Sequence, residues 1–95
     1  MNKYEITFIV KPNMEEADIK NTAEAMKKVL TDKKATIVEE KFLGQKELAY
    51  EIKKFSTGYY YYLVVECTSD VEQEFNRVAR INENLLRHLI VRVED

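Results

Sequence analysis

The chain has 95 residues with a formal net charge of −2 and 45% hydrophobic residues, which is enough for one core and excludes two domains. We therefore expect a single domain over residues 1–95 that does not cross a membrane, because no apolar run approaches the roughly 20 residues needed to span a bilayer. The N-terminus lacks the apolar stretch of a signal peptide, and the single cysteine excludes an internal disulfide, so we expect a cytoplasmic location.

The first third of the chain predicts a strand and then a helix. Residues 4–10 alternate between apolar and polar side chains, as a half-buried strand does. Asn13 and Glu16 have the spacing of a capping box and predict a helix over residues 14–32. The apolar stripe of this helix is Ile19, Ala23, Met26, Val29 and Leu30.

The middle of the chain predicts extended structure with two turns. The pattern over residues 35–43 is mixed, which is typical of an edge strand or of a bulge. Gly44-Gln45 predicts a hairpin turn, residues 48–52 resume the alternation, and residues 55–58 predict a second turn.

Four consecutive tyrosines, Tyr59–Tyr62, begin the strand that follows. Because strand side chains alternate between faces, Tyr59 and Tyr61 share the apolar face and should lie in the core. Tyr60 and Tyr62 then point the other way, where they need a nucleic-acid base, a protein partner or neighbouring side chains to cover their rings.

The last third of the chain predicts a helix and a final strand. Ser69 and Glu72 form a second capping-box pattern, and residues 82–84 stop the helix that it begins. Residues 85–93 form the strand, whose register stays open. One face would carry Leu85, Arg87, Leu89, Val91 and Val93, the other Leu86, His88, Ile90 and Arg92, so we expect a bulge or an inner position in the sheet.

The element order β-α-β-β-α-β predicts an α+β fold of the ferredoxin-like type, a sandwich of a four-stranded antiparallel sheet with two helices on one face. The other face of the sheet stays open, and Tyr60 and Tyr62 should lie on it.

Nothing in the sequence supports an enzyme, a metal site or a cofactor. His88 is the only histidine and has no second histidine or cysteine partner for zinc. Gly44 and Gly58 stand alone, so no glycine-rich phosphate loop is present. We expect neither catalysis nor a small-molecule substrate, although the fold alone does not exclude them.

Several segments in order along almost the whole chain resemble the bacterial small-subunit (30S) ribosomal protein S6 family. They are Tyr4-Glu5, Pro12-Asn13, Leu43-Gly44, residues 48–54, Gly58-Tyr59-Tyr60, residues 80–84 and residues 86–92. The resemblance implies a ferredoxin-like structural constituent of the small ribosomal subunit. Such a protein binds the central domain of 16S ribosomal RNA as a heterodimer with the basic ribosomal protein S18.

The resemblance also implies which residues bind RNA and which contact the protein partner. The implied RNA-binding residues are Lys3, Tyr4, Lys46, Lys54, Arg87, His88 and Arg92, with arginines on phosphates and Tyr4 on a sugar or stacked. The implied contacts to the protein partner, or to its junction with RNA, are Tyr50, Tyr60 and Tyr62. The negative charge agrees with this, because such a protein gains little from counterion release by itself and needs a basic partner.

Two other functions remain open on the residues alone. The chain could be a stand-alone RNA-recognition-like domain that stacks bases on its tyrosines. It could also be a small ligand-binding ferredoxin-like domain, which would need a saturable small-molecule effect that depends on Arg87 or His88.

Overall fold

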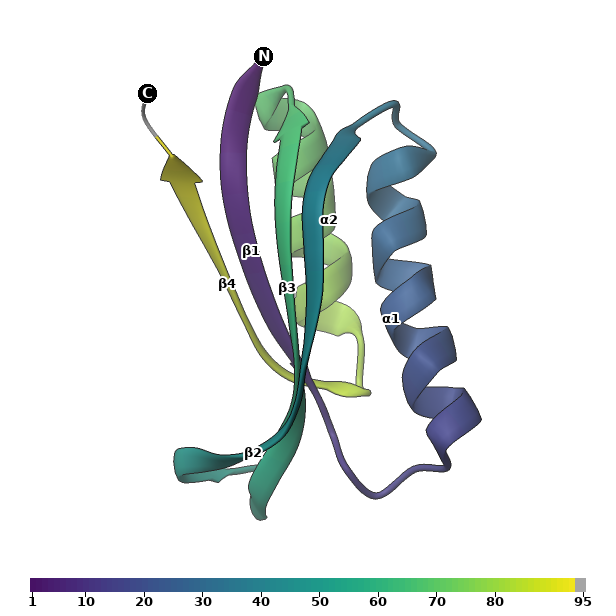
Figure 1. The fold of residues 1–95 in the computed structure, drawn as a ribbon, viewed down its shortest axis with the longest axis vertical. Coiled ribbons are helices and arrows are strands. Elements are labelled where there is room, and N and C mark those ends of the chain that lie inside the picture. The colour runs from purple at the N-terminus through teal and green to yellow at the C-terminus, as the bar shows by residue number, and fades with distance from the viewer. Residues whose placement is uncertain (94–95) are drawn as a thin grey trace.

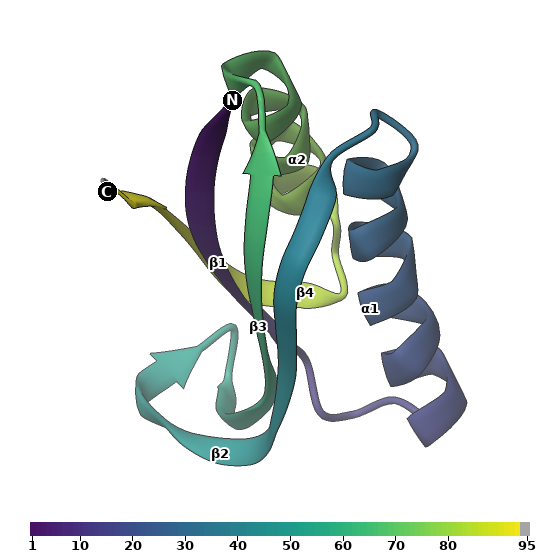
Figure 2. The same ribbon diagram turned by 45° about the horizontal axis from the view of Figure 1, so that its top comes forward.

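The computed structural model describes residues 1–93, and the last two residues of the expected domain lie outside this range. The elements are β1 (Asn2–Val10), α1 (Glu16–Thr31), β2 (Thr36–Ile52), β3 (Phe55–Cys67), α2 (Ser69–Ile81) and β4 (Leu85–Val93). The four strands form one antiparallel sheet in the order β2-β3-β1-β4. Both helices cover the same face of this sheet (Figures 1 and 2). The predicted ferredoxin-like fold is therefore confirmed.

The core lies between the helices and the two central strands. Phe8 sits at its centre, where its ring stacks on Tyr61 at 5.2 Å between centroids and is tilted against Phe75 at 6.3 Å. The apolar row predicted for β3 is confirmed, since Tyr59 and Tyr61 pack against the core and the row continues to Cys67, which is 2% exposed. The other core residues of the strands are Tyr4, Ile6, Val10, Leu63, Val65 and Leu85.

Both predicted capping boxes are wrong. Helix α1 begins at Glu16, so Asn13 lies too early to cap it, and its N-cap residue Glu15 makes no side-chain hydrogen bond to the helix. Helix α2 already includes Ser69, and the hydroxyl of its N-cap residue Thr68 donates to the Asp70 carboxylate instead of accepting a backbone N–H. Each helix still has acidic residues in its first turn, which its dipole favours.

The two predicted turns in the β2–β3 hairpin are also wrong. Gly44 lies inside β2 with φ of 85°, at one of three irregularities in the pairing of β2 with β3, and residues 55–58 belong to β3. The real turn is Lys53-Lys54, with φ of 51° and 72°. Two positive φ values match the type I′ turn that suits twisted hairpins, but Asn-Gly is its usual sequence. The irregular pattern of residues 35–43 is explained by the bulges and by the edge position of β2.

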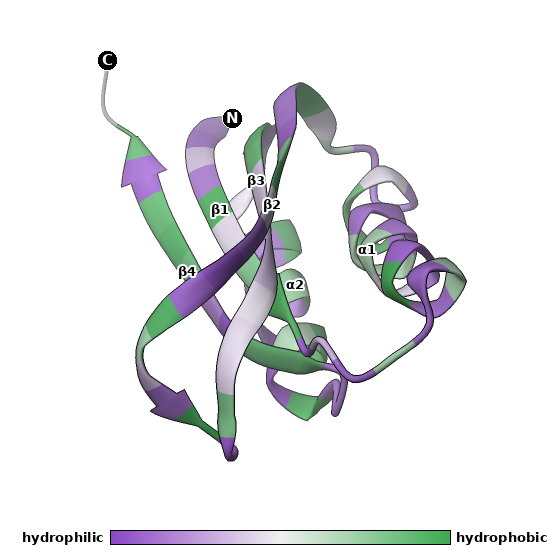
Figure 3. Ribbon diagram, turned by 60° about the horizontal axis from the view of Figure 1, so that its bottom comes forward, coloured by the Kyte–Doolittle hydropathy of each residue, from purple (hydrophilic) through white to green (hydrophobic). Residues whose placement is uncertain are grey.

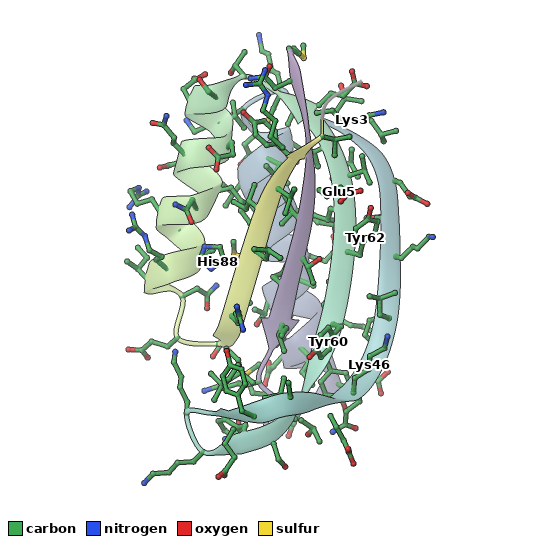
Figure 4. All side chains as sticks on the ribbon, turned by 90° about the vertical axis from the view of Figure 1, so that its left-hand side faces the viewer. Lys3, Glu5, Lys46, Tyr60, Tyr62 and His88 are labelled. Atoms are coloured by element: carbon green, nitrogen blue, oxygen red, sulfur yellow. The ribbon has the colours of Figure 1, made fainter. Side chains whose placement is uncertain are left out.

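The outer part of this hairpin, residues 45–58, forms an arm that bends across the end of the sheet (Figure 4). Gly58 permits the bend, because a Cβ atom there would lie 2.3 Å from Cγ2 of Ile9 on β1. At the far end of the arm, Lys53 Nζ donates to the backbone oxygen of Leu85 at 3.4 Å. The arm therefore connects the β2 side of the sheet to the beginning of β4.

The structure resolves the register of β4. Arg87 pairs with Ile9 and Leu89 with Thr7 of β1, so these side chains point away from the helices. His88 and Ile90 pair with core residues of β1 and point toward the helices. Strand β4 has the expected bulge, between Ile9 and Val10 on its partner, but it is an edge strand and not an inner one. Hydrophobic stretches separated by hydrophilic residues run along it (Figure 3).

Candidate RNA and partner interface

The open face is the side of the sheet that carries no helix. Alternation along the strands places four β1 residues on this face, Lys3, Glu5, Thr7 and Ile9, together with the residues that pair with them on β3 and β4. The β3 residues are Tyr60, Tyr62, Val64 and Glu66, and the β4 residues are Arg87, Leu89, Val91 and Val93. Leu89 and Val91 are 54% and 45% exposed, so β4 carries an apolar strip beside Thr7 and Glu5 of β1, with the tyrosines of β3 on the other side of β1.

The two open-face tyrosines have different neighbours (Figure 4). The Tyr62 hydroxyl donates to Oε1 of Glu5 at 3.1 Å, and burial together with this carboxylate raises the pKa of Tyr62. Tyr60 has the ammonium of Lys46 at 5.9 Å from its ring centroid, within range of a cation–π contact. The face thus carries a carboxylate bonded to Tyr62 and an ammonium group over Tyr60, and both rings are half-buried.

The arm and the adjoining end of β4 gather four of the predicted residues with one that sequence reasoning missed. Lys46 lies along the arm and Lys54 at its tip, next to Lys53. At the beginning of β4, Arg87 Nη1 donates to the hydroxyl of Tyr50 at 2.6 Å. Lys53 escaped prediction because residues 55–58 were expected to turn, whereas the positive φ values put the tip at Lys53-Lys54.

A second group of predicted residues lies at the opposite end of the sheet. Lys3 pairs with Val93 on the open face. Arg92 Nη2 donates to Oδ1 of Asn2 at 3.0 Å, and Asn2 Nδ2 donates to the Tyr4 hydroxyl at 3.2 Å. The ring of Tyr4 is in the core and only 6% exposed, so the structure does not support the expectation that it stacks on RNA.

His88 lies apart from both groups, on the helix side of the sheet. One of its ring nitrogens, Nε2, is 2.6 Å from Oδ1 of Asn76 on α2. Burial, and then the positive charge of Arg80, lower the pKa of His88. The ring is therefore a link between β4 and α2, and its neutral form is favoured.

Acidification should destabilise the protein through His88. A base whose folded pKa is depressed binds more protons when unfolded, so its contribution is full above the unfolded pKa near 6.5 and declines as pH falls through that value. We expect the free energy of unfolding, measured by urea titration, to fall between about pH 7.5 and 5.5. The fall should be smaller in His88→Gln, and an unchanged pH profile in that variant would contradict the assignment.

Residues 1–93 show little that would indicate another function. No three His, Cys, Asp or Glu side chains in this range cluster as a metal site would require. No helix in this range has the length and apolarity to cross a membrane. A groove of about 550 Å³ lies between α1 and the hairpin, with Met14, Phe42 and Tyr61 among its walls, and contains none of the predicted binding residues.

Comparisons with known proteins agree on one family. The family model described as ribosomal protein S6 matches residues 3–92. The small ribosomal subunit protein bS6 of Halalkalibacterium halodurans is 45% identical over 95 residues, covering all of both chains. That of Shouchella clausii is 44% identical over 94 residues, covering 99% of each. The crystal structure of 30S ribosomal protein S6 from Thermotoga maritima has a TM-score of 0.91 and 31% identity, covering 97% of this chain and 87% of that one.

Proposed function

The chain belongs to the ribosomal protein S6 family, and from that premise we propose that it binds the central domain of 16S ribosomal RNA together with ribosomal protein S18. The family is one of structural, non-enzymatic proteins of the small subunit of the cytoplasmic ribosome. The predictions of family, of a ribosomal role and of a non-enzyme are thereby confirmed.

The observation that carries the partner proposal is the composition of the open face. Exposed Leu89 and Val91 pair with Thr7 and Glu5 of β1, so an apolar strip adjoins the carboxylate that accepts from Tyr62. A basic protein can bury this strip and neutralise the charge of the carboxylate, whereas the same charge would repel RNA phosphates. We therefore propose the open face, with Tyr60 and Tyr62, as the surface for S18.

The basic groups at the two ends of the sheet suit RNA. We propose that Lys46, Lys54 and Arg87 bind phosphates at the arm, and that Lys3 and Arg92 do so at the opposite end. Tyr4 would act through the chain of hydrogen bonds from its hydroxyl to Asn2 and Arg92. His88 would act only by fixing β4, on which Arg87 lies.

The test is RNA binding at near-physiological salt, with a central-domain fragment of 16S RNA, with and without S18. We expect weak binding by the protein alone and strong, salt-dependent binding by the heterodimer. Tight binding by the lone protein that Tyr60→Ala and Tyr62→Ala abolish would contradict the proposal. It would indicate a stand-alone stacking platform, where each base stacked is worth about 1–3 kcal/mol.

A charge introduced into the apolar strip of β4 should weaken the binding of S18 and so test whether this strip belongs to the S18 surface. Leu89→Asp would bury an unpaired carboxylate against S18, so we expect at least about a tenfold loss of heterodimer affinity. Val38→Asp is the matched control, because Val38 is 49% exposed but lies on β2, and its effect should stay within about twofold. If calorimetry shows equal losses of heterodimer affinity in the two variants, β4 is not part of the interface with S18.

A further inference from the structure

The arm is fixed to the rest of the sheet at three places, and one of them uses a charged side chain that is otherwise unengaged. Gly58 packs on Ile9, and Lys53 donates to the Leu85 backbone oxygen. The third is the hydrogen bond of 2.6 Å between Arg87 Nη1 and the Tyr50 hydroxyl. Arg87 takes part in no ion pair within residues 1–93, so a hydroxyl alone orients its charge.

A guanidinium has five N–H donors in a fixed plane, and a tyrosine hydroxyl engages one of them. Both side chains are exposed, Tyr50 by 60%, so solvent reaches the donors that remain. A long exposed side chain ordinarily loses rotamer entropy when it binds, and a neighbour that already fixes it removes part of that cost. A neutral hydroxyl fixes the side chain and leaves the positive charge of the guanidinium available. A carboxylate in the same place would neutralise that charge.

We propose that Tyr50 is a positioning residue: its hydroxyl holds the arm against β4 and aims the Arg87 guanidinium at an RNA phosphate. This rests on the proposed RNA-binding function and changes the role of Tyr50 from a partner contact to a support for Arg87. The ring of Tyr50 need not touch RNA or protein for this. The same bond keeps the lysines at the arm tip near Arg87, since the tip is also bound to Leu85.

The test is a double-mutant cycle on RNA affinity of the heterodimer with S18, using Tyr50→Phe, Arg87→Ala and the double variant. Tyr50→Phe removes only the hydroxyl and should weaken RNA binding about two- to tenfold. In the Arg87→Ala background the same change should have an effect below about 1.5-fold. Tyr59→Phe is the matched control, because Tyr59 lies on the helix side, and it should leave affinity unchanged. Equal losses from Tyr50→Phe in the two backgrounds, or no loss in either, would overturn the positioning role.

A second measurement does not depend on RNA. Hydrogen exchange of the amides of residues 48–54 should be faster in Tyr50→Phe and in Arg87→Ala than in the wild type, and no faster in the double variant than in the singles. Unchanged exchange in Tyr50→Phe would overturn the anchoring of the arm, whatever the RNA result. Failure of the wild-type heterodimer to bind RNA would instead overturn the proposed function, and the phosphate target of Arg87 with it.

Discussion

Phe75→Ala should lower the free energy of unfolding by about 3–5 kcal/mol, because the ring is fully buried and its removal leaves a cavity. Phe75 comes from α2 and meets Phe8 of β1 at 6.3 Å, and Phe8 in turn stacks on Tyr61 of β3. The three rings join one helix to the two central strands. A domain of this size has only about 5–15 kcal/mol of stability in total, so the loss is a large fraction of it.

Chemical denaturation followed by circular dichroism measures this loss, with Phe42→Ala as the matched control. Phe42 is 60% exposed, although its ring lies 4.9 Å from that of Tyr61, so its removal should cost about 1 kcal/mol. Similar losses in the two variants would mean that the three-ring cluster is not the centre of the core.

Gly58→Ala should displace the arm and destabilise the protein by about 1–3 kcal/mol, the usual cost of overpacking. The new methyl group would lie 2.3 Å from Cγ2 of Ile9, a branched side chain that is itself only 6% exposed. The backbone oxygen of Val10 and Cδ1 of Leu86 would each lie 3.4 Å away, so the methyl group would touch both of these neighbours as well. The arm must therefore lift, which should also break the hydrogen bond between Tyr50 and Arg87.

Two companion variants identify the cause. Gly44→Ala meets nothing within 4 Å but has φ of 85°, so its cost of about 1–2 kcal/mol is backbone strain alone and should not disturb Arg87. In Ile9→Ala the clashing methyl is gone, so adding Gly58→Ala should cost much less than in the wild type. Denaturant titration gives the energies, and hydrogen exchange in the arm reports its displacement. Additive costs for Ile9→Ala and Gly58→Ala would refute the clash.

The sequence predicted the layers of the fold well because its strongest patterns are periodic. Every second residue is apolar from Tyr4 to Val10 and from Tyr59 to Cys67, and the structure puts Ile6, Phe8, Leu63 and Val65 on the core face as expected. The stripe of α1 was also correct, since Ile19, Ala23, Met26 and Leu30 are buried. These patterns report burial, which dominates the stability of the fold.

Features set by backbone geometry or by distant contacts were not predictable in this way. Lys53-Lys54 turns the chain without Asn or Gly, because anchoring at Leu85 and the twist of the hairpin hold it there. Leucine, valine and arginine occur on both faces of β4, so only its pairing with β1 separates Arg87 from His88. The candidate binding residues came from family resemblance, and it took the structure to divide them between the two ends of the sheet.

The position of Cys67 allows the reactivity of its thiol to report local opening between β3 and α2. The thiol ends the core row of β3 next to α2, and burial, followed by the charges of Glu72 and Asp70, raises its pKa. Alkylating reagents attack the thiolate, so they should react only after this end of the sheet has separated from the helix. The alkylation rate of the native protein, divided by that of the unfolded chain, therefore gives the free energy of that opening without any introduced label.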